Sequence, residues 1–170
     1  PSWKKYKASG GELERSDWRR ESVNIFVKDF YTETKKIKPW VKVGISPFGI
    51  WRPGYPEGIK GLDQYEELYA DARKWLLEGW VDYFTPQLYW ELESAGQPYR
   101  PLLKWWTEQN PNGRHIWPGN FTSRVGDRWK SEEIIGQIMA TRDQPGASGN
   151  VHFSMAAFSQ NRDGLFDKLK

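Results

Sequence analysis

Two segments decide the fold class of this chain: residues 41–46, VKVGIS, and residues 80–89, WVDYFTPQLY. Both are short, mostly apolar on both faces, and rich in β-branched or aromatic residues, which is typical of buried strands in a parallel sheet. Pro39 precedes the first segment and Gly79 the second, and both residue types end helices. We therefore interpret the two segments as strands that each follow a helix.

Helical patterns alternate with strand patterns along the rest of the chain. Apolar residues share one helical face from an expected N-cap at Ser16 to Ile37, whereas residues 1–15 are expected to be irregular. The remaining expected helices cover 65–76, 99–109, a segment from Ser131, and 161–170, and the remaining expected strands cover 115–121 and 151–155. Such alternation implies right-handed crossovers and a parallel sheet.

The connecting segments differ in length at the two ends of the expected strands. Those after strands are long and rich in Trp, Pro and Gly, whereas those before strands are short turns. In (β/α)8 barrels the chemistry lies on the loops after the strands, and a full barrel typically needs about 250 residues. The 170 residues are therefore expected to be a single α/β domain, 1–170, with about four βα units. This domain would be the C-terminal half of a TIM barrel, with the N-terminal half absent.

Composition argues against several classes of protein. The 25 basic and 22 acidic residues are interspersed, so no nucleic-acid partner is expected. The chain has no Cys, and His115 and His152 have no third ligand nearby, so no metal site is expected. The absence of G-x-G-x-x-G after any strand argues against a nucleotide cofactor, and no cofactor is expected. No apolar run of about 18 residues is present, so no transmembrane segment is expected.

Several runs resemble the glycosyl hydrolase-like 10 family: SDWRR at 16–20, VKVGISPFGIWR at 41–52, LYADARKW at 68–75, EGWVDY at 78–83 and TPQLYW at 85–90. The resemblance extends from Ser16 to Gly164. It implies a TIM barrel that acts on glycosidic bonds, in bacterial proteins that are exported or attached to the envelope. It also implies an N-terminal part with an Asp-Asp-Tyr-type segment that carries the principal acids. No Asp-Asp pair occurs here, so the chain alone is expected to be inactive.

Glycoside hydrolysis needs two carboxyl groups that flank the bond. Among the acids after predicted strands, Glu91 is the best placed, because it follows Tyr89 and Trp90 past the second strand. The alternative interpretation is a solvated loop acid. Asp82 lies at the opposite end of its strand and is expected to be a structural hydrogen-bonding group.

The candidate substrate-binding residues are aromatic or polar and lie at or after strand ends. Sugars stack their C–H faces on aromatic rings, and their hydroxyls need polar partners. The aromatic candidates are Trp51, Tyr89, Trp90 and Trp129, and the polar candidates are Ser46, Arg52, Gln87, Asn120 and Ser154. Arg52 is expected to bind hydroxyls or an acidic sugar. Trp117 belongs to the same aromatic set, and the alternative for Trp51 and Trp117 is packing against the barrel rim.

These features predict a glycoside hydrolase that cleaves O-glycosidic bonds of a bacterial poly- or oligosaccharide by carboxylate acid/base chemistry. The alternative is a non-catalytic carbohydrate-binding barrel fragment. The expected partners are a carbohydrate and, at the open sheet edges, the missing half-barrel or a second copy of the chain. The resemblance implies an exported protein: periplasmic, on the cell surface, or secreted.

Overall fold

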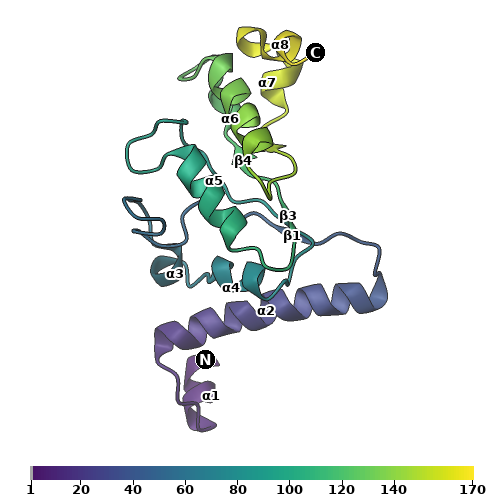
Figure 1. Ribbon diagram of the computed structural model, residues 1–170. Coiled ribbons are helices and arrows are strands. Elements are labelled where there is room, and N and C mark those ends of the chain that lie inside the picture. The colour runs from purple at the N-terminus through teal and green to yellow at the C-terminus, as the bar shows by residue number, and fades with distance from the viewer. Residues whose placement is uncertain (1) are drawn as a thin grey trace.

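A computed structural model describes residues 2–170, and helices flank short parallel strands in it (Figure 1). The helices are α1 (Ser2–Ala8), α2 (Arg15–Ile37), α3 (Gln64–Glu67), α4 (Ala72–Leu77), α5 (Tyr99–Glu108), η1 (Thr122–Arg124), α6 (Ser131–Asp143), α7 (Ala156–Ser159), η2 (Arg162–Gly164) and α8 (Leu165–Lys168). The strands are β1 (Gly44–Ile45), β2 (Tyr83–Phe84), β3 (His115–Ile116), β4 (Gly119–Asn120) and β5 (Val151–His152).

The strands pair in parallel and in chain order. β2 lies between β1 and β3, and β4 pairs with β5. Single parallel bridges join Phe48 to Gln87, Gln87 to Gly119, and Ile116 to Ala147. Residues 115–120 therefore connect both groups of strands, and the parallel α/β arrangement predicted from the sequence is confirmed.

The main hydrophobic core lies between the sheet and the helices that cover its outer face. Phe84 of β2 packs against Trp106 of α5 with ring centroids 5.1 Å apart, and both side chains are fully buried. The indole N–H of Trp106 donates to the carbonyl of Gly49 at 2.8 Å, which satisfies its polar atom. This packing fixes the position of the segment that leads away from β1.

Successive side chains along each strand alternate between the two faces of the sheet, and those that point away from the covering helices form its inner face. The Tyr83 ring lies over Gly44 of the neighbouring strand and would collide with any side chain there. Tyr83 in turn stacks on Trp117 with centroids 4.8 Å apart. The residues of the candidate site continue this inner face toward the carboxyl ends of the strands.

Asp82 connects three elements at the amino ends of the strands. Its carboxylate accepts a 2.7 Å hydrogen bond from the Val43 N–H and forms a salt bridge with Lys35 of α2. Burial favours a raised pKa for Asp82, but the hydrogen bonds from Lys35 and Val43 outweigh it and leave the pKa below its ordinary value. These contacts bear out the structural role expected for Asp82.

Several predicted boundaries need correction. The segment expected to be irregular contains α1, because Trp3 and Tyr6 pack their rings 5.3 and 5.9 Å from Trp18. α2 begins at Arg15 with Glu14 as its N-cap, so Ser16 lies inside the first turn. The helix expected over 65–76 is two short helices, α3 and α4, because Tyr69 has a φ of +53° and ends the helical path. The last predicted helix is likewise divided into η2 and α8.

Only part of the apolar face predicted for α2 is buried. The helix buries Arg20, Asn24 and Val27, whereas Phe26, Phe30 and Ile37 are 68, 52 and 72% exposed. Polar groups take the buried positions because α4 and its neighbours supply partners, such as the Trp75 indole N–H that donates to Asn24 at 2.8 Å. α2 therefore has an apolar surface without a partner in residues 2–170.

Candidate functional site

Ser46 and Gln87 meet at the carboxyl ends of adjacent strands. The Gln87 amide donates to the Ser46 carbonyl at 3.0 Å and lies 3.4 Å from the Ser46 hydroxyl. The Phe48–Gln87 and Gln87–Gly119 bridges place this amide in the middle of the strand ends. After these contacts, both side chains keep further hydrogen-bond donors or acceptors that a ligand could use.

Four rings gather next to this pair and form what we call the aromatic cluster: Tyr89, Phe121, Phe153 and Trp129. The Phe121 centroid lies 5.0 Å from Tyr89, 6.1 Å from Phe153 and 6.3 Å from Trp129. Tyr89 is half-buried, and this burial raises the pKa of its hydroxyl above the ordinary value. The cluster joins the segments that follow β2, β4 and β5 into one apolar platform, of which Phe153 is 55% exposed.

Phe121 and Phe153 were not among the residues expected from the sequence. Both continue the inner-face alternation of their strands, two positions after Gly119 and Val151. Both residues lie within the predicted strands 115–121 and 151–155, so period-two alternation along those strands is the signal that could have found them.

A pair of hydroxyls lies beside the cluster. The Ser123 and Ser154 oxygens are 3.3 Å apart, and the Ser123 N–H donates to the Phe153 carbonyl at 2.8 Å. The structure therefore brings Ser154 to the same strand ends as Tyr89 and Trp129. Trp129 also lines a small hollow of about 130 Å³ next to Lys130 and Asp163.

Trp90 and Glu91 begin the loop after β2. Trp90 packs edge-on against Phe48 with centroids 5.5 Å apart. The backbone on both sides of Glu91 is held by α6, because Gln137 donates to the Trp90 carbonyl at 3.0 Å and Glu133 accepts from the Leu92 N–H at 2.8 Å. The Glu91 side chain itself is exposed.

Asn120 does not join the strand-end group. Its side chain is fully buried on the helix side of the sheet. Its amide donates to Gln137 at 2.8 Å and to the Tyr99 hydroxyl at 3.1 Å, and its oxygen accepts from Asn150 at 2.8 Å. Burial raises the pKa of Tyr99 to about 12, against smaller opposing effects of its hydrogen bonds. Asn120 thus belongs to a buried polar network under α5 and α6.

Trp51 and Arg52 also lie apart from the aromatic cluster. Trp51 stacks on Trp105 of α5 at 5.9 Å, and its indole N–H donates to Asp71 at 3.1 Å. Arg52 donates to Asp63 and Glu66, both at 3.2 Å. Trp117, on the inner face below the cluster, donates to the Ser148 hydroxyl at 2.9 Å.

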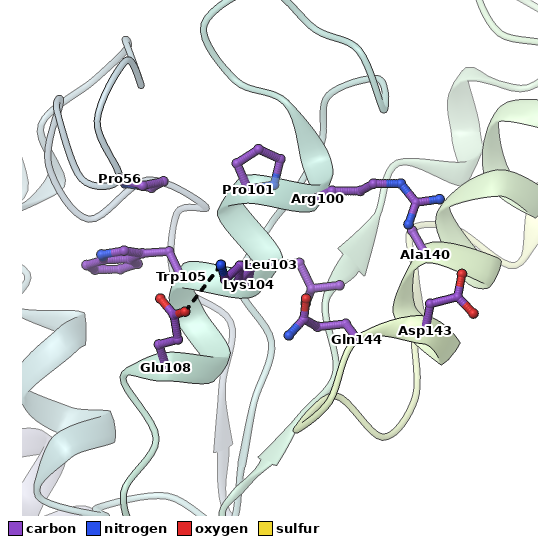
Figure 2. Close-up of a pocket in the computed structure, with 10 residues that line it drawn as sticks. All are labelled: Pro56, Arg100, Pro101, Leu103, Lys104, Trp105, Glu108, Ala140, Asp143 and Gln144. Carbon is purple, nitrogen blue, oxygen red and sulfur yellow. Dashed lines mark ion pairs between the residues drawn. The ribbon is translucent and has the colours of Figure 1, made fainter.

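An open groove of about 480 Å³ lies on the helix layer, between α5 and α6 (Figure 2). Leu103 and Trp105 of α5 are among its lining residues, and Trp105 points toward Pro56 (Figure 2). Lys104 and Glu108, which also line it, form an ion pair of 3.8 Å. None of the strand-end residues lines this groove.

Within residues 2–170, no cluster of three or more His, Asp or Glu side chains is arranged to hold a metal ion. In that same part of the chain, no helix has the length and apolar character needed to cross a membrane.

The fold and the strand-end residues define a parallel α/β domain with polar and aromatic side chains gathered where its strands end. The profile of the family described as glycosyl hydrolase-like 10 matches residues 3–134. The chain therefore belongs to this family, and the predicted resemblance is confirmed.

Curated relatives carry the same class name. Glycosyl hydrolase YngK of Bacillus subtilis (strain 168) is 37% identical over 164 residues, which cover 90% of this chain and 32% of the relative. Glycosyl hydrolase DigH of Escherichia coli (strain K12) is 32% identical over 164 residues, which cover 87% of this chain and 37% of the relative. The DigH of Shigella flexneri gives the same values. The chain thus spans about a third of the length of these curated relatives.

Proposed function

We propose that this chain is part of a glycoside hydrolase and forms the C-terminal half of its (β/α)8 barrel. The observation that carries the proposal is the convergence of Gln87, the aromatic cluster and Ser154 at the carboxyl ends of consecutive parallel strands. In (β/α)8 enzymes the active site lies at this end of the barrel. Family membership and the names of the relatives support glycosidic bonds as the target.

The substrate is a bacterial poly- or oligosaccharide, and its rings stack on the aromatic cluster. The hydroxyl and amide groups of Ser46, Gln87 and Ser154 hydrogen-bond the sugar hydroxyls. Glu91 acts in acid/base chemistry from the loop after β2, where α6 holds the backbone on both sides of it. The principal carboxylates come from a part of the barrel outside this chain, because glycosidases need a pair of them.

A non-catalytic carbohydrate-binding domain is the second candidate. The observation in its favour is that the side chains gathered at the strand ends within residues 2–170 are aromatic, hydroxyl or amide groups, while Glu91 is exposed on its loop. Such a domain binds sugars through the same platform without cleaving them.

The two candidates are separated by turnover of a glycan panel by the complete polypeptide in which this chain occurs. A glycosidase is expected to release reducing ends, and Glu91→Gln is expected to lower turnover by about 10²–10⁴-fold with sugar affinity retained. Ser94→Ala on the same loop serves as the control. Unchanged turnover in the Glu91→Gln variant would remove Glu91 from the mechanism, and binding without turnover would favour the second candidate.

The proposed barrel also requires a partner surface. The apolar face of α2 and the two outer strands are suited to the other half of the barrel or to a second copy of the chain.

As for cellular location, we propose export, in line with the resemblance. Fractionation of cells that express the complete polypeptide tests this, and recovery in the cytoplasm alone would contradict it.

A further inference from the structure

A guanidinium group lies over the aromatic cluster. The Arg124 Cζ is 4.8 Å from the centroid of Phe121, the ring that contacts the other three members of the cluster. The attraction between a cation and the face of a ring holds a guanidinium in place while leaving its N–H edge free to donate. A sugar that stacks on these rings would therefore meet a positive charge.

The donors of Arg124 remain available within residues 2–170. Its ion pair with Asp127 is 3.7 Å long, and the Asp127 side chain is 69% exposed. An exposed pair of that length contributes little, whereas the arginine side chain has five N–H donors. The Arg124 side chain is itself 33% exposed, so solvent and solutes reach it.

Two other arginines that could bind an acidic sugar already form hydrogen bonds or ion pairs with protein groups. Arg162 donates to the Ser123 carbonyl at 3.0 Å and to Gln160 at 2.7 Å. Arg52, which the sequence suggested for an acidic sugar, pairs with Asp63 and Glu66 away from the cluster.

We propose that Arg124 binds the carboxylate of an acidic sugar whose ring stacks on the aromatic cluster. This inference rests on the proposed function and names the sugar class that the strand-end site selects. The rings match the C–H face of the sugar, and the Ser123 and Ser154 hydroxyls beside them match its hydroxyls. The planar fork of Arg124 matches a carboxylate in bidentate geometry. Arg124 is thus a specificity-determining residue.

The test uses the 170-residue chain and two matched pairs of ligands in calorimetric titrations. One pair is oligogalacturonates and their methyl esters, and the other is hyaluronan oligosaccharides and their carboxyl-reduced derivatives. In at least one pair the acidic member is expected to bind about tenfold more tightly, as a charged hydrogen bond of the usual strength implies. Added salt should reduce this preference.

Two variants and a control assign the preference to one side chain. Arg124→Gln is expected to abolish the preference and to retain affinity for the neutral member. Arg124→Lys keeps a cation near Phe121 without the planar fork and should weaken the preference several-fold. Arg142→Gln, an exposed arginine on α6, is the matched control and should leave the preference unchanged.

The outcomes separate this inference from the proposed function. Equal binding of acidic and neutral members, or a full preference in either Arg124 variant, overturns the role of Arg124 and leaves sugar binding intact. If none of the sugars binds to the chain, both the proposed sugar site and the role of Arg124 are overturned.

Discussion

Asp82 shows how a single carboxylate joins elements that are distant in sequence. It lies 39 residues from the Val43 N–H that donates to it, and Lys35 reaches it from α2. Its side chain is only 10% exposed. Replacing this carboxylate by an amide removes its charge and one of its two acceptor oxygens, so a donor loses its partner, which costs more than the hydrogen bond itself contributes.

Asp82→Asn is therefore expected to lower the free energy of unfolding by about 1–3 kcal/mol at neutral pH. Folding lowers the pKa of Asp82, so its stabilising effect is complete above the ordinary pKa of an aspartate and is lost as the pH falls through the lower folded value. Urea unfolding from neutral to acidic pH should show the gap between wild type and variant closing in acid. Glu33→Gln, at an exposed position of α2, is the control, and a gap that does not depend on pH would argue against this linkage.

The inner face of the sheet depends on close approach between neighbouring strands. At Gly44 of β1 the absence of a side chain admits the Tyr83 ring of β2, which then stacks on Trp117. This arrangement sets the layer of rings beneath Gln87 and the aromatic cluster.

Gly44→Ala is expected to destabilise the fold by about 1–3 kcal/mol, because the added methyl group forces the Tyr83 ring away. Thermal and denaturant unfolding measure the loss. Tyr83→Ala in the same chain removes the obstacle, so the double variant should lose less than the sum of the two single variants. Simple additivity of the two losses would show that Tyr83 and Gly44 do not compete for the same space.

The sequence predicts the helices and strands better than it predicts which of their faces are buried. The strand–helix alternation predicts the parallel pairing, since β-branched runs and helical periodicity are local signals. The exposure of Phe26 and Phe30 was not predicted, because both have the spacing of a buried stripe. Of that stripe Val27 is buried, next to the polar Arg20 and Asn24. Burial of those polar residues depends on partners from other elements, which no local pattern reveals.

Part of the candidate site could likewise be predicted from the sequence. Family likeness and strand-end position indicated Gln87, Tyr89 and Ser154; Gln87 contacts Ser46, Tyr89 joins the aromatic cluster, and Ser154 follows Phe153 of that cluster. Asn120 also lies at a strand end, but it points to the helix side, because one position along a strand reverses the face of the side chain. Alternation therefore separates Asn120 from Gly119 and Phe121, whereas the strand order that brings Gln87 beside Gly119 appears only in three dimensions.

At the scale of the whole molecule, exposed apolar side chains occur in the segments before β1 and after β5. Phe26, Phe30 and Trp40 precede β1 in the chain, and Phe153 and Phe166 follow Val151 of β5, with exposures from 45 to 72%. Thr85, on the inner face by alternation, has a buried hydroxyl for which residues 2–170 supply no hydrogen-bond partner. Apolar surface and unpaired strand edges of this kind favour association.

The isolated chain is therefore expected to self-associate in a concentration-dependent manner, with the α2 face in the contact. Phe30→Glu should shift the equilibrium toward monomer by about tenfold or more, because a charge would have to be buried against apolar groups. Ser22→Glu adds the same charge at an exposed polar position of the same helix, and this control should leave the mass distribution unchanged. Light scattering across a concentration series, together with solution X-ray scattering, measures the mass and shape. A wild-type chain that stays monomeric and soluble at every concentration would contradict association through the α2 face. The exposed rings of α2 would then remain in contact with water without a partner.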